Sequence, residues 1–432
     1  MENIVIGSGP AGRLASVELG KLGKEVLLIE KNHIAGTCLN EGCMVICALT
    51  DIAKFIDSNK RFNKYGFIKS KINISYNKIV EKIKETQEVF RNINQIENES
   101  YGNEIIYGEA ILQGDTVVVN GESFNYENLL IATGARPYIP NIPGSQYGLT
   151  NKDILKLDDI PDKLNIIGGG IIACEVANIF STLGSEVNIF ARSIFLKDLE
   201  EDIKVYIKTN LIPDVNVYEG VNIVEIGKNK VVCETGEEFE GRPFIATGRI
   251  PNSEIAKDIL EINSDNSIKV NEMMQTNVNN IYSAGDVTGG ISLTPVARME
   301  GITAARNMAG YLNKISYSCI PQTLSLNMDV SFVDRKNNTP KNKIINLETP
   351  GLGGPGTFWN GLTGDTGFTR IAMNRDENKI EKITSISPSS VSDVSYLSYL
   401  MRINADINDF DKFLEIHPST DANYKLIKTM WL

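Results

Sequence analysis

The sequence predicts an α/β protein with two Rossmann-like dinucleotide-binding domains and a C-terminal α+β domain. Three observations support this fold class. The chain has 432 residues, too many for one hydrophobic core, so three or four structural units are expected. A pattern of strand, glycine-rich turn, helix and strand occurs twice, near the N-terminus and again from about residue 164. From about residue 321 the sequence becomes a mixture of helical and strand-like segments.

Charge and hydropathy exclude several classes of function. No apolar run approaches the roughly 20 residues that span a bilayer, and the first residues contain no basic, cleavable signal region. The formal net charge of -11 argues against nucleic acid or an anionic membrane surface as a partner. We therefore expect a cytoplasmic protein that binds neither nucleic acid nor membrane.

The cysteines and histidines limit the possible metal sites. Of six cysteines, three fall within ten residues of one another, a spacing unlike a secreted disulfide scaffold or a pair of zinc-binding CxxC motifs. Only two histidines are present, so a histidine-rich metal site is excluded. We expect no metal. Clustered cysteines in a cytosolic chain indicate catalysis.

The first strand–turn–helix–strand unit ends at about residue 30. Its glycine-rich turn permits a tight bend and lets a pyrophosphate approach the N-terminus of the next helix, where free N–H groups favour an anion. A carboxylate at the end of the second strand would accept hydrogen bonds from ribose hydroxyls, although a solvated strand end is the alternative. The residues predicted to bind this dinucleotide are Gly7, Gly9, Gly12 and Glu30.

The second unit repeats the glycine turn. Its residues predicted to contact a second dinucleotide are Gly168, Gly170 and, in the third glycine position, Ala173. Two such units in one chain indicate two dinucleotides, as in a flavin enzyme that exchanges electrons with nicotinamide. We therefore expect FAD and NAD(P) as cofactors.

The end of the second unit bears on the choice of coenzyme. Gly7 and Glu30 are 23 residues apart, and the residue 23 positions after Gly168 is Ala191, so the ribose-binding carboxylate is missing. Arg192 follows and is suited to a 2′-phosphate. This change favours NADP(H) over NAD(H). The alternative is that Arg192 is an ordinary surface charge.

Cys38 and Cys43 come directly after the first unit. Residues five apart in an ideal α-helix have Cα atoms roughly 8–9 Å apart, whereas a disulfide needs less than about 7 Å. The pair can close only if the backbone departs from helix, which Gly42 makes easier. A bond held in this way should be reducible. We predict a redox-active pair; the alternative is two buried structural cysteines.

Four further segments make the chain similar to a known family: 132–137, 246–252, 281–287 and 292–297. Together with the motifs above they resemble the class I pyridine nucleotide–disulfide oxidoreductases, which include dihydrolipoamide dehydrogenase, glutathione reductase and mercuric reductase. The resemblance extends along nearly the whole chain. It implies that Cys43 is the thiolate facing the flavin and that Cys38 is the interchange thiol. It assigns Thr37, Thr133, Gly134, Asp286 and Ala297 to FAD, and Gly248 and Arg249 to NAD(P).

The family also implies four parts of the chain. These are an FAD-binding part at 1–143, an NAD(P)-binding domain at 144–264, a central part at 265–318 that completes the FAD domain, and a C-terminal dimerisation domain at 319–432. A homodimer is therefore expected.

In the family, the partner subunit supplies a catalytic histidine from a His-Pro-Thr-x-x-Glu motif. His417 matches it, but Ala422 replaces the glutamate and Asp421 lies one residue early. The resemblance makes His417 the base that takes and returns a thiol proton. A capping or surface histidine is the alternative.

The segment after Cys43 departs from the family. A lysine that normally follows and pairs with a glutamate near the flavin is replaced by Cys47, whereas the glutamate matches Glu175. Cys47 lies four residues after Cys43 and shares its helix face. It is either a third redox thiol or a small apolar filler, and we favour the filler.

The predicted activity is electron transfer between NAD(P)H and a small or protein-bound disulfide or dithiol, similar to dihydrolipoamide dehydrogenase. The alternatives are an NADPH-dependent reductase of another small disulfide, similar to glutathione reductase, and a flavin-binding redox sensor without disulfide turnover. Mercuric reductase is disfavoured, since no cysteine follows Cys319 to form a second metal-binding pair.

Overall fold

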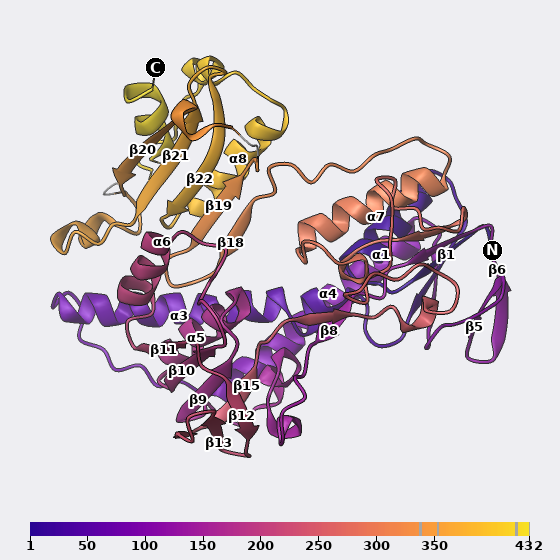
Figure 1. Ribbon diagram of the computed structural model, residues 1–432, viewed down its shortest axis with the longest axis horizontal. Coiled ribbons are helices and arrows are strands. Elements are labelled where there is room, and N and C mark those ends of the chain that lie inside the picture. Colours follow the sequence, from indigo (N-terminus) through magenta and orange to yellow (C-terminus); the bar gives the residue numbers. More distant parts are fainter. Residues whose placement is uncertain (337–338, 352–353, 420–421, 432) are drawn as a thin grey trace.

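The first dinucleotide unit is a parallel five-stranded sheet in the order β17–β7–β1–β2–β3 (Figure 1). The computed structural model describes residues 1–336, 339–351, 354–419 and 422–431. The central strands are buried along their whole length because helices cover the sheet, which explains their unbroken apolar sequence. The strands are β1 (Asn3–Ile6), β2 (Val26–Glu30), β3 (Glu104–Tyr107), β7 (Asn128–Ile131) and β17 (Ile281–Ser283).

Two helices that are distant in sequence pack together on this sheet. Helix α1 (Pro10–Lys21) follows the first glycine turn, and α7 (Thr294–Met308) arrives after the chain has built the second unit and returned through β17. Their interface is small-residue packing: a Cβ added at Gly301 would lie 2.1 Å from the carbonyl oxygen of Ala11. The first unit is therefore built from two segments of the chain that are separated by the second unit.

The second unit is a parallel four-stranded sheet in the order β11–β10–β9–β15. Helix α5 (Ile171–Leu183) follows its glycine turn, and α6 (Glu201–Tyr206) lies at its edge. The strands are β9 (Lys163–Ile167), β10 (Glu186–Ala191), β11 (Val215–Glu219) and β15 (Arg242–Ile245). The two parallel units confirm the predicted α/β class.

Small antiparallel elements join the two units. The ribbon of β8 (Ala135–Pro137) and β16 (Arg249–Pro251) links the first unit to the end of the second. The other strands form two three-stranded sheets, β4 (Ile111–Gln113), β5 (Thr116–Val119) and β6 (Glu122–Asn125), and β12 (Ile223–Ile226), β13 (Lys230–Cys233) and β14 (Glu238–Glu240).

Long helices follow the cysteines. They are α3 (Cys43–Lys64) and α4 (Tyr76–Ser100), preceded by the short α2 (Gly36–Asn40). Although α3 starts in the first unit, Val45, Leu49 and Ile56 lie in the same hydrophobic core cluster as residues of α5 and β9. Helix α3 therefore packs in the core of the second unit.

The C-terminal domain is an antiparallel five-stranded sheet, ordered β18–β19–β22–β21–β20, with α8 (Ser390–Arg402) against it. This matches the predicted α+β character; dimerisation stays a prediction. Arg370 ties the sheet to the second unit through ion pairs with Glu200 and Asp202 of that unit, at 2.6 and 2.5 Å. The strands are β18 (Gln322–Leu324), β19 (Val330–Asp334), β20 (Ile344–Pro350), β21 (Phe368–Asn374) and β22 (Lys379–Ile386).

Two features are absent from the described residues. None of their helices is both long and apolar enough to cross a membrane. They also contain no group of three His, Cys, Asp or Glu side chains placed to hold a metal ion.

Candidate active site

The first glycine turn is shaped to admit a pyrophosphate. A Cβ added at Gly7 would lie 2.4 Å from the carbonyl oxygen of Ala132, and Gly7 has a φ of +98°. A Cβ at Gly12 would lie 1.9 Å from the Gly7 carbonyl oxygen, so both positions need glycine. Gly9 faces open space, and no side chain among the described residues caps α1. The first N–H groups of α1 are thus accessible to phosphate.

Glu30 lies at the end of β2 as predicted. Its buried carboxylate accepts hydrogen bonds from the Ser8 N–H at 2.9 Å and the Ser8 hydroxyl at 2.6 Å. Its other oxygen accepts from the Asn32 N–H at 2.8 Å. These bonds fix the carboxylate beside the glycine turn, where a ribose of bound FAD would lie.

Asp286 lies beside a cation from a distant part of the chain. Burial raises the pKa of its carboxyl group, and the charge of Arg249 opposes that rise. The Arg249 Nε lies 3.5 Å from Asp286 Oδ2, and its guanidinium donates to the Ala135 carbonyl oxygen. Arg249 therefore lies against Asp286, and its predicted contact with NAD(P) stays a prediction. Gly248, its neighbour, has a φ of +122°.

The remaining predicted FAD residues surround the same region. Thr133 donates a hydrogen bond to the Asn252 carbonyl oxygen at 2.7 Å, and Gly134 follows with a φ of +68°. Ala297 is buried on α7 near Gly285, since a Cβ added at Gly285 would lie 3.7 Å from the Cβ of Ala297.

Glu300 is a buried acid that the sequence did not single out. Its carboxylate accepts from the Gly285 N–H at 2.7 Å and from the Tyr317 hydroxyl at 2.8 Å. Burial raises its pKa to about 7. Since Gly285 precedes Asp286, Glu300 positions the turn that carries the predicted flavin-binding acid. Glu300 belongs to no recognised sequence motif, so its buried position on α7 could not be predicted from the sequence.

The second glycine turn repeats the geometry of the first. Gly168 has a φ of +128°, and an added Cβ would lie 2.2 Å from the Ala246 carbonyl oxygen. Gly170 faces open space, and Ala173 is fully buried. A Cβ at Gly169 would lie 2.6 Å from the Cβ of Ala191. Ala191 thus occupies the place that Glu30 has beside Ser8 in the first unit.

An acid on the neighbouring strand was missed. Glu219 ends β11 and is the register partner of Ala191, and its Oε1 accepts from the Phe195 N–H at 2.9 Å. Lys208 lies 3.9 Å from the same carboxylate. Arg192 is exposed between these elements. Ala191, where the ribose-binding carboxylate is missing, therefore has both an acidic residue, Glu219, and basic residues, Lys208 and Arg192, nearby.

The two predicted redox cysteines meet at the break between α2 and α3. Helix α2 ends at Asn40 and α3 begins at Cys43, so the expected departure from ideal helix is present. A Cβ at Gly42 would lie 2.9 Å from the Thr37 carbonyl oxygen, which shows how closely the turn folds back. Both cysteines are free thiols.

Thr294, at the start of α7, contacts both sulfur atoms. Its hydroxyl donates to Cys38 Sγ at 3.2 Å and lies 3.8 Å from Cys43 Sγ. A hydrogen bond from Cys43 lowers the pKa of Cys38 to about 6, with a further contribution from Thr294. The same shared hydrogen bond raises the pKa of Cys43. The two thiols therefore share a hydrogen bond, and the expected role of Cys43 as the thiolate facing the flavin stays a prediction.

Cys47 and Glu175 come together from α3 and α5. Burial raises the pKa of Glu175 to about 7, and its Oε1 accepts from the Ser325 N–H at 2.9 Å. Burial and the charges of Cys43 and Glu175 raise the pKa of Cys47. The side chain of Cys47 keeps an exposed surface although part of it is desolvated, and the choice between an apolar filler and a third redox thiol stays a prediction. Nearby, Lys54 pairs with Asp329 at 2.8 Å.

His417 lies on an exposed segment of the C-terminal domain. No hydrogen bond within the described parts of the chain joins it to the cysteines. Thr420 and Asp421, part of its motif, lie outside the described residues, and Ala422 is buried. Its predicted role requires a second subunit.

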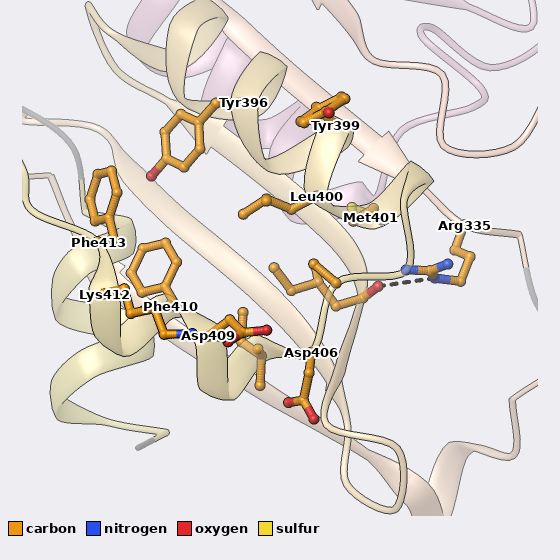
Figure 2. A pocket seen from close by; sticks show the side chains of 13 residues that line it. Arg335, Tyr396, Tyr399, Leu400, Met401, Asp406, Asp409, Phe410, Lys412 and Phe413 are labelled. Atoms are coloured by element: carbon orange, nitrogen blue, oxygen red, sulfur yellow. Dashed lines mark hydrogen bonds and ion pairs between the residues drawn. The ribbon is translucent and has the colours of Figure 1, made fainter.

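A cavity of about 340 Å³ lies beside α8 in the C-terminal domain (Figure 2). Along one side run the rings of Tyr396, Phe410 and Phe413, with ring centroids 5.6 Å apart for Tyr396–Phe413 and 4.7 Å apart for Phe410–Phe413. None of the predicted site residues lines it. The cavity is separate from the cysteine site.

Comparison with known proteins identifies the family. A model of the family described as pyridine nucleotide-disulphide oxidoreductase matches residues 1–301. The chain belongs to this family. Oxidoreductases of this family are flavoproteins that use a pyridine nucleotide, so the enzyme carries out FAD-dependent pyridine nucleotide–disulfide oxidoreduction.

Individual relatives agree with this family assignment. The chain is 31% identical to a dihydrolipoyl dehydrogenase of Buchnera aphidicola subsp. Baizongia pistaciae, over 87% of this chain and 84% of the relative. It is 31% identical to a mercuric reductase of Bacillus cereus, over 80% of this chain and 58% of the relative. The HOCl-induced flavoprotein disulfide reductase RclA from Escherichia coli superposes with a TM-score of 0.86 at 22% identity, covering 99% and 100% of the two chains, and supports the fold.

Proposed function

We propose that this oxidoreductase passes electrons between NADP(H) and a small or protein-bound disulfide or dithiol, in the manner of dihydrolipoyl dehydrogenase. The observation that carries the proposal is the contact of Thr294 with both Cys38 and Cys43, which places the two sulfur atoms at the N-terminus of α7. Bound FAD supplies the two-electron carrier between the nicotinamide and this pair.

The chain's own residues divide the work at the cysteines. Cys38, whose pKa is lowered by hydrogen bonds from Cys43 and Thr294, attacks one sulfur of the substrate as a thiolate. Cys43 then attacks Cys38 in the mixed disulfide, releases the second thiol and closes the protein disulfide. His417 of a second subunit would take and return the thiol proton.

A reductive titration tests this function. Anaerobic addition of NADPH should deliver about two electrons more to the wild-type enzyme than to Cys38→Ser or Cys43→Ser, since a disulfide is a two-electron couple. Visible absorption and a thiol count report the two centres separately. Equal electron uptake by all three proteins would contradict a redox role of the pair, as would purification without FAD.

The second candidate is a flavin-binding redox sensor without disulfide turnover. Its supporting observation is Glu175, whose carboxyl group has a raised pKa and no ion pair with a described lysine or arginine. A sensor would accept electrons in the titration but would not turn over lipoamide or glutathione disulfide. Turnover of either compound at a rate abolished by Cys38→Ser would favour the enzyme.

A further inference from the structure

Two arginines lie close to the thiol of Cys38. Thr294, which donates a hydrogen bond to Cys38 Sγ at 3.2 Å, is the first residue of α7. Arg298 comes four residues later on the same face of this helix. Arg13 lies on α1, which packs along α7. The first turns of two neighbouring helices therefore place two cationic residues near enough to interact electrostatically with Cys38.

Only one of these two cations is neutralised. Arg13 is half-buried and forms an ion pair with Glu97 of α4. Arg298 is exposed and has no ion-pair partner among the described residues. Burial, opposed by Glu97, lowers the pKa of Arg13, and the like charge of Arg298 lowers it further. One uncompensated positive charge thus remains beside Cys38, in a place where it repels a neighbouring cation.

Stabilisation of the Cys38 thiolate does not by itself explain why an unpaired positive charge lies at Arg298. The hydrogen bonds from Cys43 and Thr294 lower the pKa of Cys38 more than the charge of Arg298 does. The exposed guanidinium of Arg298 also makes no hydrogen bond with the described residues, so its donors are available in the fork that matches a carboxylate or phosphate. The remaining partner for this charge is an anion that arrives with the substrate.

We propose that Arg298 binds an anionic group, a carboxylate or a phosphate, on the disulfide substrate while Cys38 attacks its sulfur. The proposal rests on the function proposed above and names the class of substrate. The Cys38 thiolate bonds to one sulfur as the substrate S–S bond breaks, and the first thiolate leaves. Cys43 then displaces the second thiolate and gives up its proton, so the substrate gains two electrons and the cysteine pair loses them.

A single-step exchange measures this recognition apart from turnover. In the FAD-containing Cys43→Ser/Cys47→Ser protein, Cys38 is the accessible thiol, because Cys174, Cys233 and Cys319 are buried. Two aromatic disulfides serve as probes: dithiobis(nitrobenzoate), which is a dianion, and dithiodipyridine, which is neutral. The rate ratio of the two reagents cancels any change in the nucleophilicity of Cys38.

We expect Arg298→Gln to lower the ratio of dianion to neutral rates by about two- to fivefold at low salt, the range for an exposed ion pair. High salt should shrink the difference, since the charges are screened. Arg298→Lys should retain most of the ratio. Arg306→Gln, which removes an exposed arginine on the same helix that pairs with Glu18, should leave the ratio unchanged.

The possible results distinguish a failure of the Arg298 proposal from a failure of the proposed disulfide oxidoreductase function. If Arg298→Gln slows both reagents equally, the arginine only tunes the thiolate and the proposal is wrong. The same holds if the ratio is insensitive to Arg298 and to salt. If Cys38 reacts with neither reagent in the parent protein, the role of Cys38 as interchange thiol fails instead.

Discussion

At the scale of single residues, the exchange of a lysine for Cys47 has an identifiable electrostatic effect. Glu175 keeps its place next to this position, but its partner is a backbone N–H instead of an ammonium group. A carboxylate desolvated without a cation retains its proton to higher pH, in agreement with its pKa of about 7. The sequence allowed this shift to be predicted, because the glutamate is present and the lysine is absent.

We predict that Cys47→Lys lowers the pKa of Glu175 by about one unit or more, because an ammonium group favours the charged carboxylate. The midpoint in the pH profile of FAD reduction by NADPH should move down accordingly. Cys47→Met, of similar reach but uncharged, should not move it, and neither should Cys47→Lys combined with Glu175→Gln. Additive effects in this double-mutant cycle would show that the two residues do not interact.

Glu300 should make stability depend on pH. Its folded pKa of about 7 lies above the ordinary value of 4.5, so the folded state holds a proton that the unfolded state has already lost between these values. Stability should therefore fall as pH rises from about 4.5 to 7, by on the order of 2–3 kcal/mol for this group. Thermal unfolding of Glu300→Gln should show a flatter pH dependence.

An exposed acid provides the comparison for Glu300. Glu225 lies on the surface of β12, so Glu225→Gln should keep the wild-type slope. A Glu300→Gln protein with an unchanged slope would mean that the carboxyl group titrates normally. Gln can retain both hydrogen bonds, with its oxygen facing Gly285 and its amide facing Tyr317, so gross unfolding is not expected.

At the scale of structural elements, the glycine turns could be predicted well because their requirement is local. Each needs a residue without Cβ where the backbone approaches a carbonyl oxygen, and the sequence shows this directly. The acid on β11 could not be predicted in the same way. Glu219 reaches Ala191 only through the pairing of β10 with β11, a contact between segments that no local motif records.

The end of β10 therefore gives a test of coenzyme preference. We expect kcat/KM for NADPH to exceed that for NADH, and Arg192→Ala to raise the KM for NADPH about tenfold with less effect on NADH, since a phosphate–arginine contact is lost. Glu219→Gln tests the alternative coenzyme. If Glu219 instead binds a 2′-hydroxyl, the wild-type enzyme will prefer NADH and this substitution will weaken NADH binding.

At the scale of the whole molecule, the position of His417 predicts an enzyme that works as a dimer. The histidine is exposed and shares no hydrogen bond with the cysteines within the described residues, so its expected role in catalysis calls for a second copy. Coexpressed Cys38→Ser and His417→Ala chains should form hybrid dimers with one intact site. Their mixture should recover roughly a quarter of the wild-type disulfide turnover, although each variant alone is inactive.

The two single-variant proteins are the controls for this complementation, and sedimentation should show one dimeric species in all samples. No recovery from the hybrids would remove His417 from the site, as would an active monomer. The sequence indicated the histidine through its motif, whereas its place in a site shared by two chains follows from assembly, which no local motif records.

The position of helix α3 affects how the protein unfolds and how it is cleaved by proteases. It begins with a redox cysteine of the first unit, packs its apolar face into the core of the second, and reaches the C-terminal domain through Lys54 and Asp329. Cutting the chain between the predicted domains would leave that apolar face exposed to water. Limited proteolysis should therefore fail to release a stable 1–143 fragment, and the first two units should unfold together in one cooperative transition.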